Sequence, residues 1–191
     1  MTLIFVTSNE HKYEEAEKLA EKFDIDIKRR NIPYIEVQAD NLEEVVKPSA
    51  QQACKLAGEP CFVEDAGLFI DSLNGFPGPY SSYVFETLGN RGILKLMKGT
   101  ENKRGEFRSA IGYCEPGEKP QVFKGKVVGT ISEEIRGERG FGYDPIFMPE
   151  RGEGGTFAEM STEMKNNLSH RAEAIEKFVK WYRRNKMVGG G

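Results

Sequence analysis

The chain has 191 residues, of which 30% are charged and 38% hydrophobic, and its formal net charge is −3 at pH 7. This composition fits one globular domain, or one compact two-lobed unit, and excludes the intrinsically disordered class. The negative charge argues against a broad nucleic-acid-binding surface, so we expect no nucleic-acid partner.

The sequence also indicates a compartment. The apolar run near the N-terminus is too short for a signal peptide, and no stretch of the sequence reaches transmembrane length. Cys54, Cys61 and Cys114 form no CxxC or zinc-type spacing, so we interpret them as buried, reduced thiols. We therefore expect a cytoplasmic protein without membrane contact, with one catalytic domain over residues 1–186 and a flexible tail over 187–191.

The first half of the chain alternates strand-like and helix-like patterns. Apolar runs predict the strands, and apolar residues at helical spacing predict the helices. In chain order they are a strand over 2–7, a helix over 12–23, a strand over 25–32, a helix over 42–56 and a strand over 61–63. Ser8 or Asn9 can cap the first helix, and Pro48 has to kink the second helix or restart it.

The second half adds a hairpin. Its predicted elements are a stiff loop over 74–79, short helices over 82–88 and 93–98, strands over 106–114 and 121–131 joined at Pro116-Gly117, a glycine-rich loop over 136–144, a strand over 146–148, and a last helix capped by Ser169. Early strand–helix alternation with a later hairpin predicts an α/β protein with a mixed sheet.

The segment between the first strand and the first helix is a candidate anion site. It contains Thr7, Ser8, Asn9, Glu10, His11 and Lys12. Free backbone N–H groups and the helix dipole favour an anion there, and Lys12 adds a positive charge. No Walker A pattern is present, and an ordinary capped turn explains the same residues.

A pair of acidic residues, Glu64-Asp65, directly follows the third predicted strand. Ligand sites of α/β sheets gather at strand ends, and a carboxylate there can hold Mg²⁺ or orient a water molecule. Neighbouring strand residues point to opposite faces, so one of the two is expected to face a given cleft. A solvated strand end is the alternative. Glu36 could complete a metal site with Asp65, but spacing does not distinguish it from Glu43 or Glu44.

Two further segments could contact a nucleotide. In Phe141-Gly142-Tyr143-Asp144, an aromatic ring could stack on a base and Asp144 could read its edge, although the loop could equally be a hydrophobic anchor.

The second segment is Lys165 with Ser169-His170-Arg171. Cations in the first turn of a helix are unfavourable, so either a ligand supplies oxygen atoms there or a carboxylate does, such as Glu173 or a remote Asp.

Taken together and in order, five segments resemble the family of inosine triphosphate pyrophosphatases. They are TSNEHK at 7–12, VEDAGL at 63–68, LNGFPGPYS at 73–81, FGYDPIF at 141–147 and KNNLSHR at 165–171. The combination of FGYDP with SHR is the most specific part of the match. The resemblance implies an elongated mixed sheet with helices on both faces, two lobes around a cleft, and a homodimer. It also implies Mg²⁺-dependent hydrolysis of ITP, dITP and XTP to the monophosphate and pyrophosphate.

The resemblance further implies roles for individual residues. The segment 7–12 would cradle phosphates, and the segment 141–144 would form part of the base pocket. Asp65 would be the general base and, with Glu36, a metal ligand. Lys165, His170 and Arg171 would contact the nucleotide.

Two positions depart from the family pattern. Ala66 stands where members often have Ser or Thr, so only its backbone can touch the substrate. Ser82 lies in the region where some members carry Lys, and we expect no phosphate contact from it.

Three other functions compete with this one. A nucleotide-binding regulator without turnover would have no use for acidic groups beside the phosphates. An RNA-binding domain could use Phe141 and Tyr143 as stacking platforms, but the net charge disfavours it. A pyrophosphatase for modified pyrimidines is closer, and only the resemblance of FGYD and SHR favours purines.

Overall fold

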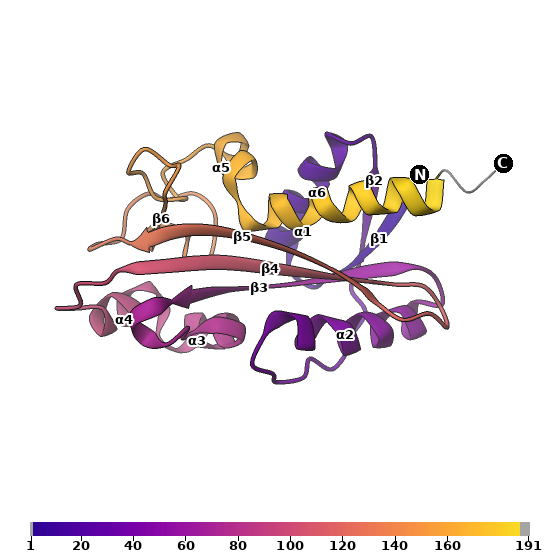
Figure 1. Cartoon of the computed structure of the whole chain (residues 1–191), viewed down its shortest axis with the longest axis horizontal. Helices are drawn as coiled ribbons and strands as arrows, with labels where there is room; N and C mark the ends of the chain where they lie inside the picture. Colours follow the sequence, from indigo (N-terminus) through magenta and orange to yellow (C-terminus); the bar gives the residue numbers. More distant parts are fainter. Residues whose placement is uncertain (1, 188–191) are drawn as a thin grey trace.

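Six strands form one sheet in the order β2-β1-β3-β4-β5-β6 in the computed structural model, which describes residues 2–187 (Figure 1). The strands are β1 (Thr2–Val6), β2 (Asp26–Arg30), β3 (Cys61–Ile70), β4 (Arg104–Cys114), β5 (Gln121–Ile131) and β6 (Phe147–Pro149). β1 pairs in parallel with β2 and β3, and the remaining neighbours are antiparallel. The expected mixed α/β fold is therefore confirmed.

Helices cover both faces of the sheet. One face carries α1 (Glu10–Glu21) and α6 (His170–Tyr182), and the other carries α2 (Leu42–Ala57), α3 (Ser81–Thr87) and α4 (Gly89–Leu96), as Figure 1 shows. The short helix α5 (Thr162–Leu168) directly precedes α6. No helix within residues 2–187 combines the length and the apolar character that crossing a bilayer demands.

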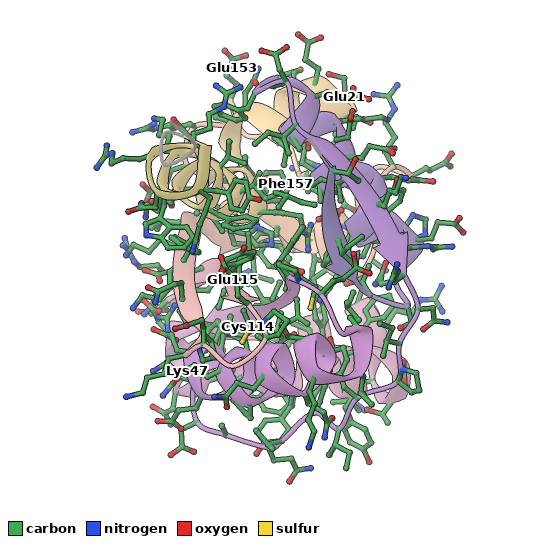
Figure 2. All side chains as sticks on the ribbon, turned by 90° about the vertical axis from the view of Figure 1, so that its right-hand side faces the viewer. Glu21, Lys47, Cys114, Glu115, Glu153 and Phe157 are labelled. Atoms are coloured by element: carbon green, nitrogen blue, oxygen red, sulfur yellow. The ribbon has the colours of Figure 1, made fainter. Side chains whose placement is uncertain are left out.

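Alternation along the long strands builds a core on each side of the sheet. On β3, Phe62 packs with α1 and α6, whereas Cys61 and Val63 pack with α2. Figure 2 shows side chains filling both layers, with Phe157 inside and Glu21 at the surface. Each large apolar side chain that is fully buried stabilises the fold by about 1.5–3 kcal/mol.

The strand that contains the acidic pair is much longer than the sequence predicted. β3 does not end at Val63 but continues to Ile70, because β4 pairs with it along its whole length, from Cys61 opposite Cys114 to Ile70 opposite Gly105. Glu64 and Asp65 therefore lie inside a strand, so the prediction that they directly follow a strand was wrong, and the alternative of a solvated strand end does not hold either. It is β1 that ends near this point.

The structure decides part of one helical prediction and adds a helix. α2 continues through Pro48, so the expected restart is wrong, whereas the expected kink stays a prediction. Pro48 cannot donate to the carbonyl of Glu44, but Glu44 is exposed and water can satisfy it, while the apolar residues on both sides of Pro48 pack against the sheet. The sequence did not predict α5, which Ser161 caps.

The expected tail over 187–191 is mostly outside the described residues. Arg183–Met187 forms a π-helical turn after α6, so helical structure reaches Met187, and residues 188–191 lie beyond the part that the structure describes.

The LNGFPGPYS segment supports the second half of β3. The hydroxyl of Ser81 accepts a hydrogen bond from Leu68 N at 2.8 Å, and Ile70 N donates to Phe76 O at 3.3 Å. A Cβ atom on Gly67 would lie 2.3 Å from the carbonyl oxygen of Gly78, closer than any real contact. The segment thus covers an edge that β1 leaves open, and it fits only because residue 67 has no side chain.

We therefore predict that Gly67→Ala destabilises the protein by about 1–3 kcal/mol, because the backbone of the supporting segment has to move. Urea unfolding measures the effect. Gly155→Ala is the matched control, since a Cβ there would meet nothing closer than Gly152 O at 3.4 Å. Equal stability of the two variants would contradict the close packing at Gly67.

Candidate active site

A cavity of about 960 Å³ opens where β1 separates from β3. β1 pairs with β3 only through Ile4 and Phe5, so the edge of β3 beyond Phe62 faces the loop that follows β1. Almost all predicted site residues line this cavity, namely Thr7, Ser8, Asn9, His11, Lys12, Glu36, Asp65, Ala66, Phe141, Gly142, Tyr143, Asp144, Lys165, His170 and Arg171. Segments distant in the sequence thus meet at a strand end, as expected for α/β sheets.

Glu10 is the exception among the predicted residues. It is exposed at the start of α1, does not line the cavity, and pairs with Arg29 at 3.7 Å. The start of the helix turns its side chain away from the cleft, so any contact of Glu10 with a substrate would have to come from its backbone, and its substrate-binding role stays a prediction.

The loop before α1 is a capped turn that also delivers a cation to the cleft. Asn9 is the N-cap, and its Oδ1 accepts from Lys12 N at 3.1 Å, while Asn9 N donates to Thr7 Oγ1 at 3.1 Å. The Nζ atom of Lys12 crosses to β3, where it donates to the carbonyl oxygen of Glu64 at 3.1 Å.

Lys12 also pairs with both acidic side chains of β3. Its Nζ lies 3.1 Å from Glu64 Oε2 and 3.8 Å from Asp65 Oδ1. Burial lowers the pKa of Lys12, but Glu64 and Asp65 raise it by more. Burial raises the pKa of Asp65 to about 6, against the opposing effect of Lys12. Such a carboxylate is suited to accept a proton near neutral pH.

The backbone of Ala66 lies on the open edge of β3. Alternate residues direct their polar groups to this edge, since Glu64 O accepts from Lys12 and Leu68 N donates to Ser81. Ala66 N stands between them and donates to Asp65 Oδ1 at 2.9 Å. The position is consistent with the expected backbone contact to a substrate.

Arg171 is fully buried and is held by two carboxylates from other elements. Its Nε donates to Glu64 Oε1 at 3.2 Å, and its Nη1 donates to Glu15 on α1. The suggested local partner Glu173 instead pairs with Lys177. Remote carboxylates therefore account for the cation at the start of α6, and they are glutamates rather than an aspartate.

His170 is neutral, not cationic. Burial lowers the pKa of His170 well below its ordinary value, and the charge of Arg171 acts in the same direction. Its ring stacks on Phe107 at 4.8 Å, and its Nδ1 has no hydrogen-bond partner within residues 2–187. His170 can therefore offer a neutral polar nitrogen atom to the cavity. Because the ring is uncharged, the dipole of α6 does not disfavour it at the start of the helix.

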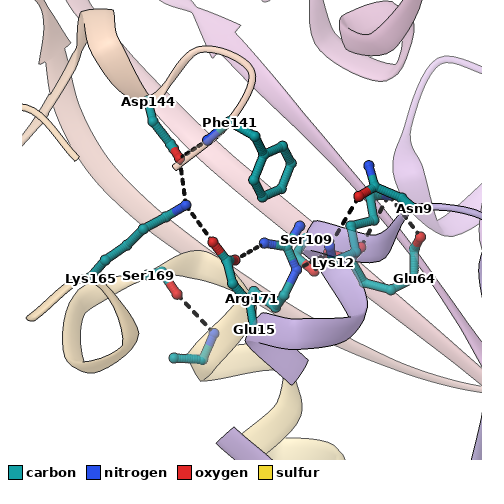
Figure 3. A network of polar contacts seen from close by, with 11 residues as sticks. Asn9, Lys12, Glu15, Glu64, Ser109, Phe141, Asp144, Lys165, Ser169 and Arg171 are labelled. Carbon is teal, nitrogen blue, oxygen red and sulfur yellow. Dashed lines mark hydrogen bonds and ion pairs between the residues drawn. The ribbon is translucent and has the colours of Figure 1, made fainter. Parts of the chain in front are cut away.

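Lys165 extends the ion pairs toward the glycine-rich loop. Its Nζ lies 2.6 Å from Glu15 Oε1 and 2.6 Å from Asp144 Oδ2. Figure 3 shows that these contacts join those of Arg171 and Lys12 in one network. Seven side chains thus alternate in charge, and we call them the charge chain: Asp144, Lys165, Glu15, Arg171, Glu64, Lys12 and Asp65.

The loop 141–144 combines the two roles that the sequence left open. Tyr143 is its anchor, because it is buried and its hydroxyl donates to Ser81 O at 2.9 Å. Phe141 stays partly exposed, stacks on His11 at 5.3 Å, and lies 4.9 Å from the Lys165 ammonium group. The aromatic ring available for stacking is therefore that of Phe141.

Glu36 lies in the irregular segment after β2 and lines the same cleft as Asp65. Within residues 2–187, no group of three or more His, Cys, Asp or Glu side chains stands ready to hold a metal ion. Magnesium is commonly held by one or two carboxylates together with substrate phosphates, so this donor set fits Mg²⁺ rather than zinc. The net charge of the cavity lining also favours a bound cation, because the lining contains three Lys and Arg side chains and five carboxylates.

Sequence reasoning missed two buried members of the charge chain. Glu15 lies three residues after Lys12 on α1, beside the buried Ala16, so a charged residue in the apolar stripe of the helix could have revealed it. Glu64 was recognised only as a neighbour of Asp65. Its partner Ser109, which donates to Glu64 Oε1 at 2.7 Å, comes from β4 and has no sequence signature.

The sequence model of the Ham1 family matches residues 3–181 of this chain. The chain belongs to the Ham1 family. It is 52% identical to the dITP/XTP pyrophosphatase of Methanopyrus kandleri over 97% of this chain and 98% of that protein, and 49% identical to the one of Methanothermobacter marburgensis over 98% and 100%.

Solved structures of the Ham1 family have the same fold. The HAM1 protein of Coxiella burnetii superposes with a TM-score of 0.84 at 27% identity, covering 96% of this chain and 99% of that one. The Ham1 protein of Staphylococcus aureus gives 0.82 at 28% identity, covering 97% and 100%.

The buried carboxylate of Glu64 leads to a pH prediction for this Ham1-family chain. Burial raises the pKa of Glu64, but Arg171, Lys12 and Ser109 lower it by more, to about 2. Ionised Glu64 therefore stabilises the fold above its ordinary pKa of 4.5, and this contribution, up to about 3 kcal/mol, is lost as the pH falls toward 2. We expect Glu64→Gln to flatten the dependence of the unfolding free energy on pH in that window. Circular dichroism at a series of pH values tests this, and parallel curves for both proteins would contradict it.

Proposed function

We propose that the chain hydrolyses ITP, dITP and XTP to the monophosphate and pyrophosphate, and so removes these non-standard purine nucleotides from the cellular pool. One observation carries the proposal: Lys12, Asp65 and Arg171 line a single cavity, together with the aromatic ring of Phe141. The names of the archaeal relatives, dITP/XTP pyrophosphatases at 52% and 49% identity, support it.

In this proposal, water attacks the α-phosphorus and the bond to the bridging oxygen of the leaving pyrophosphate breaks. Asp65 orients the water and takes its proton, a role that suits a carboxyl group whose pKa is raised to about 6. Lys12, beside Asp65, stabilises negative charge on the departing group, together with Lys165. Glu36 and Asp65 would hold Mg²⁺, which supplies charge neutralisation on the phosphates and lowers the pKa of water.

Recognition of the purine would take place at the other end of the cleft. Hypoxanthine and xanthine present a 6-oxo acceptor, to which Arg171 or a backbone N–H of the loop 141–144 can donate. Adenine presents a 6-amino donor, so two donors would meet and one would remain unpaired, at a cost of about 1–3 kcal/mol. Phe141 provides a stacking surface for the ring system.

The proposal includes a cytoplasmic homodimer. The three cysteines are free and buried, which suits a reducing compartment. Large apolar side chains remain exposed, among them Ile35 at 72% and Tyr83 at 68%, and a second copy of the chain could cover such surface.

The direct test incubates the protein with ITP and Mg²⁺ and identifies the products. We expect pyrophosphate and IMP, and no turnover after the divalent cation is chelated. Asp65→Asn is the matched control, because it keeps the shape of the side chain and removes the base. It should lower kcat by roughly 10²–10⁴-fold with the fold intact. Release of orthophosphate, or near-normal turnover of the variant, would overturn the assignment.

A second prediction concerns Arg171. Arg171→Lys keeps a cation between Glu15 and Glu64 but removes the planar fork of donors. We expect the preference for ITP over ATP, measured as the ratio of kcat/KM values, to narrow by about tenfold. Arg104→Lys, at an exposed arginine outside the cavity, is the control that should leave the ratio unchanged. An unchanged ratio in Arg171→Lys would show that the base is read elsewhere.

A further inference from the structure

Glu64 lies between Arg171 and Lys12 in the charge chain. Its Oε1 accepts from Arg171 Nε at 3.2 Å, and its Oε2 lies 3.1 Å from Lys12 Nζ. In the proposed function, Arg171 contacts the purine and Lys12 contacts the phosphates. Among the residues that the structure describes, Glu64 is the carboxylate that pairs with both Arg171 and Lys12, whereas Glu15 pairs with Arg171 and Lys165.

The pairs on the two sides of Lys12 are unequal. Lys12 lies 3.1 Å from Glu64 but 3.8 Å from Asp65. The side chains of Glu64 and Arg171 are each only 2% exposed, so solvent screens their interaction little. A change in how strongly Arg171 holds Glu64 will therefore alter how strongly Glu64 holds Lys12, and in turn the looser pair of Lys12 with Asp65.

We propose that Glu64 is a positioning residue that links recognition of the purine to the release of Asp65 for catalysis. A 6-oxo group that accepts from Arg171 weakens the hold of Arg171 on Glu64. Glu64 then draws Lys12 away from Asp65, and Asp65 becomes free to orient the attacking water. Adenine offers Arg171 no acceptor at position 6 and leaves Lys12 on Asp65.

This inference rests on the proposed function and deepens it, because it makes the identity of the base affect kcat as well as KM. Binding contacts alone would discriminate through KM. A link through the charge chain adds a difference in kcat, and double changes along the chain should show coupling.

The experiment compares kcat and KM for ITP and ATP, at saturating Mg²⁺, in the wild-type protein and in Glu64→Gln. Glutamine keeps the shape of the side chain and can still accept from Arg171 and Ser109, but it has no charge. We expect kcat to favour ITP by roughly tenfold or more in the wild type and by less than about threefold in the variant, while the ratio of KM values is retained. An unchanged kcat ratio in Glu64→Gln would overturn the proposal, as would a wild-type protein that discriminates through KM alone.

Two further variants make the result interpretable. Glu106→Gln makes the same chemical change on β4, outside the cavity lining, and should alter neither ratio. Glu64→Asp keeps the charge but is one methylene shorter, so it cannot hold Arg171 and Lys12 together, and it should also reduce the kcat ratio. It provides the test if circular dichroism shows that Glu64→Gln does not fold, and an unchanged kcat ratio in Glu64→Asp would then contradict the link.

Failure of the link and failure of the proposed function give different results. If the wild-type protein releases no pyrophosphate from ITP, the function itself is wrong. If it does, and Glu64→Gln keeps the wild-type kcat ratio, only the role of Glu64 is refuted.

Discussion

The buried charge of Arg171 has to be balanced inside the protein, and much of the cleft is arranged around that requirement. An unpaired ion in the interior costs several kcal/mol, so each cation of the charge chain lies between two carboxylates. These groups come from α1, β3, α5, α6 and the loop 141–144, so the ion pairs join five parts of the chain. Electrostatic balance thereby fixes the relative positions of both ends of the site.

The sheet provides the rigid frame on which this network stands. β3 is held by β4 along its full length, while β1 leaves it after two paired residues, and the resulting open edge becomes the floor of the cleft. The segment with Gly78 and Ser81 covers the rest of that edge. Asp65 therefore lies on well-supported backbone, with only its cleft side free to meet a substrate. In its proposed role as a base, a side chain held in this way would lose little entropy when substrate binds.

The sequence predicted most elements because their patterns are local. Helical spacing of apolar residues identified α1, α2 and α6, and the turn at Pro116-Gly117 identified the hairpin of β4 and β5. The length of β3 could not be predicted, since its second half depends on pairing with β4, some forty residues further along the chain. The continuity of α2 through Pro48 likewise depends on packing against the sheet and on solvent near Glu44, which override local preference.

By itself, the sequence determined which kinds of chemical group the site contains, because the polar segments at Thr7–Lys12, Glu64-Asp65, Phe141–Asp144 and Lys165–Arg171 carry their own signatures. Only the tertiary structure decided the partners and charge states of these groups. It paired Arg171 with two glutamates, added Glu15 to the network, kept His170 neutral and turned Glu10 away from the cleft. The physical reason is that charge states and ion pairs depend on distance and burial, which are set by residues remote in the chain.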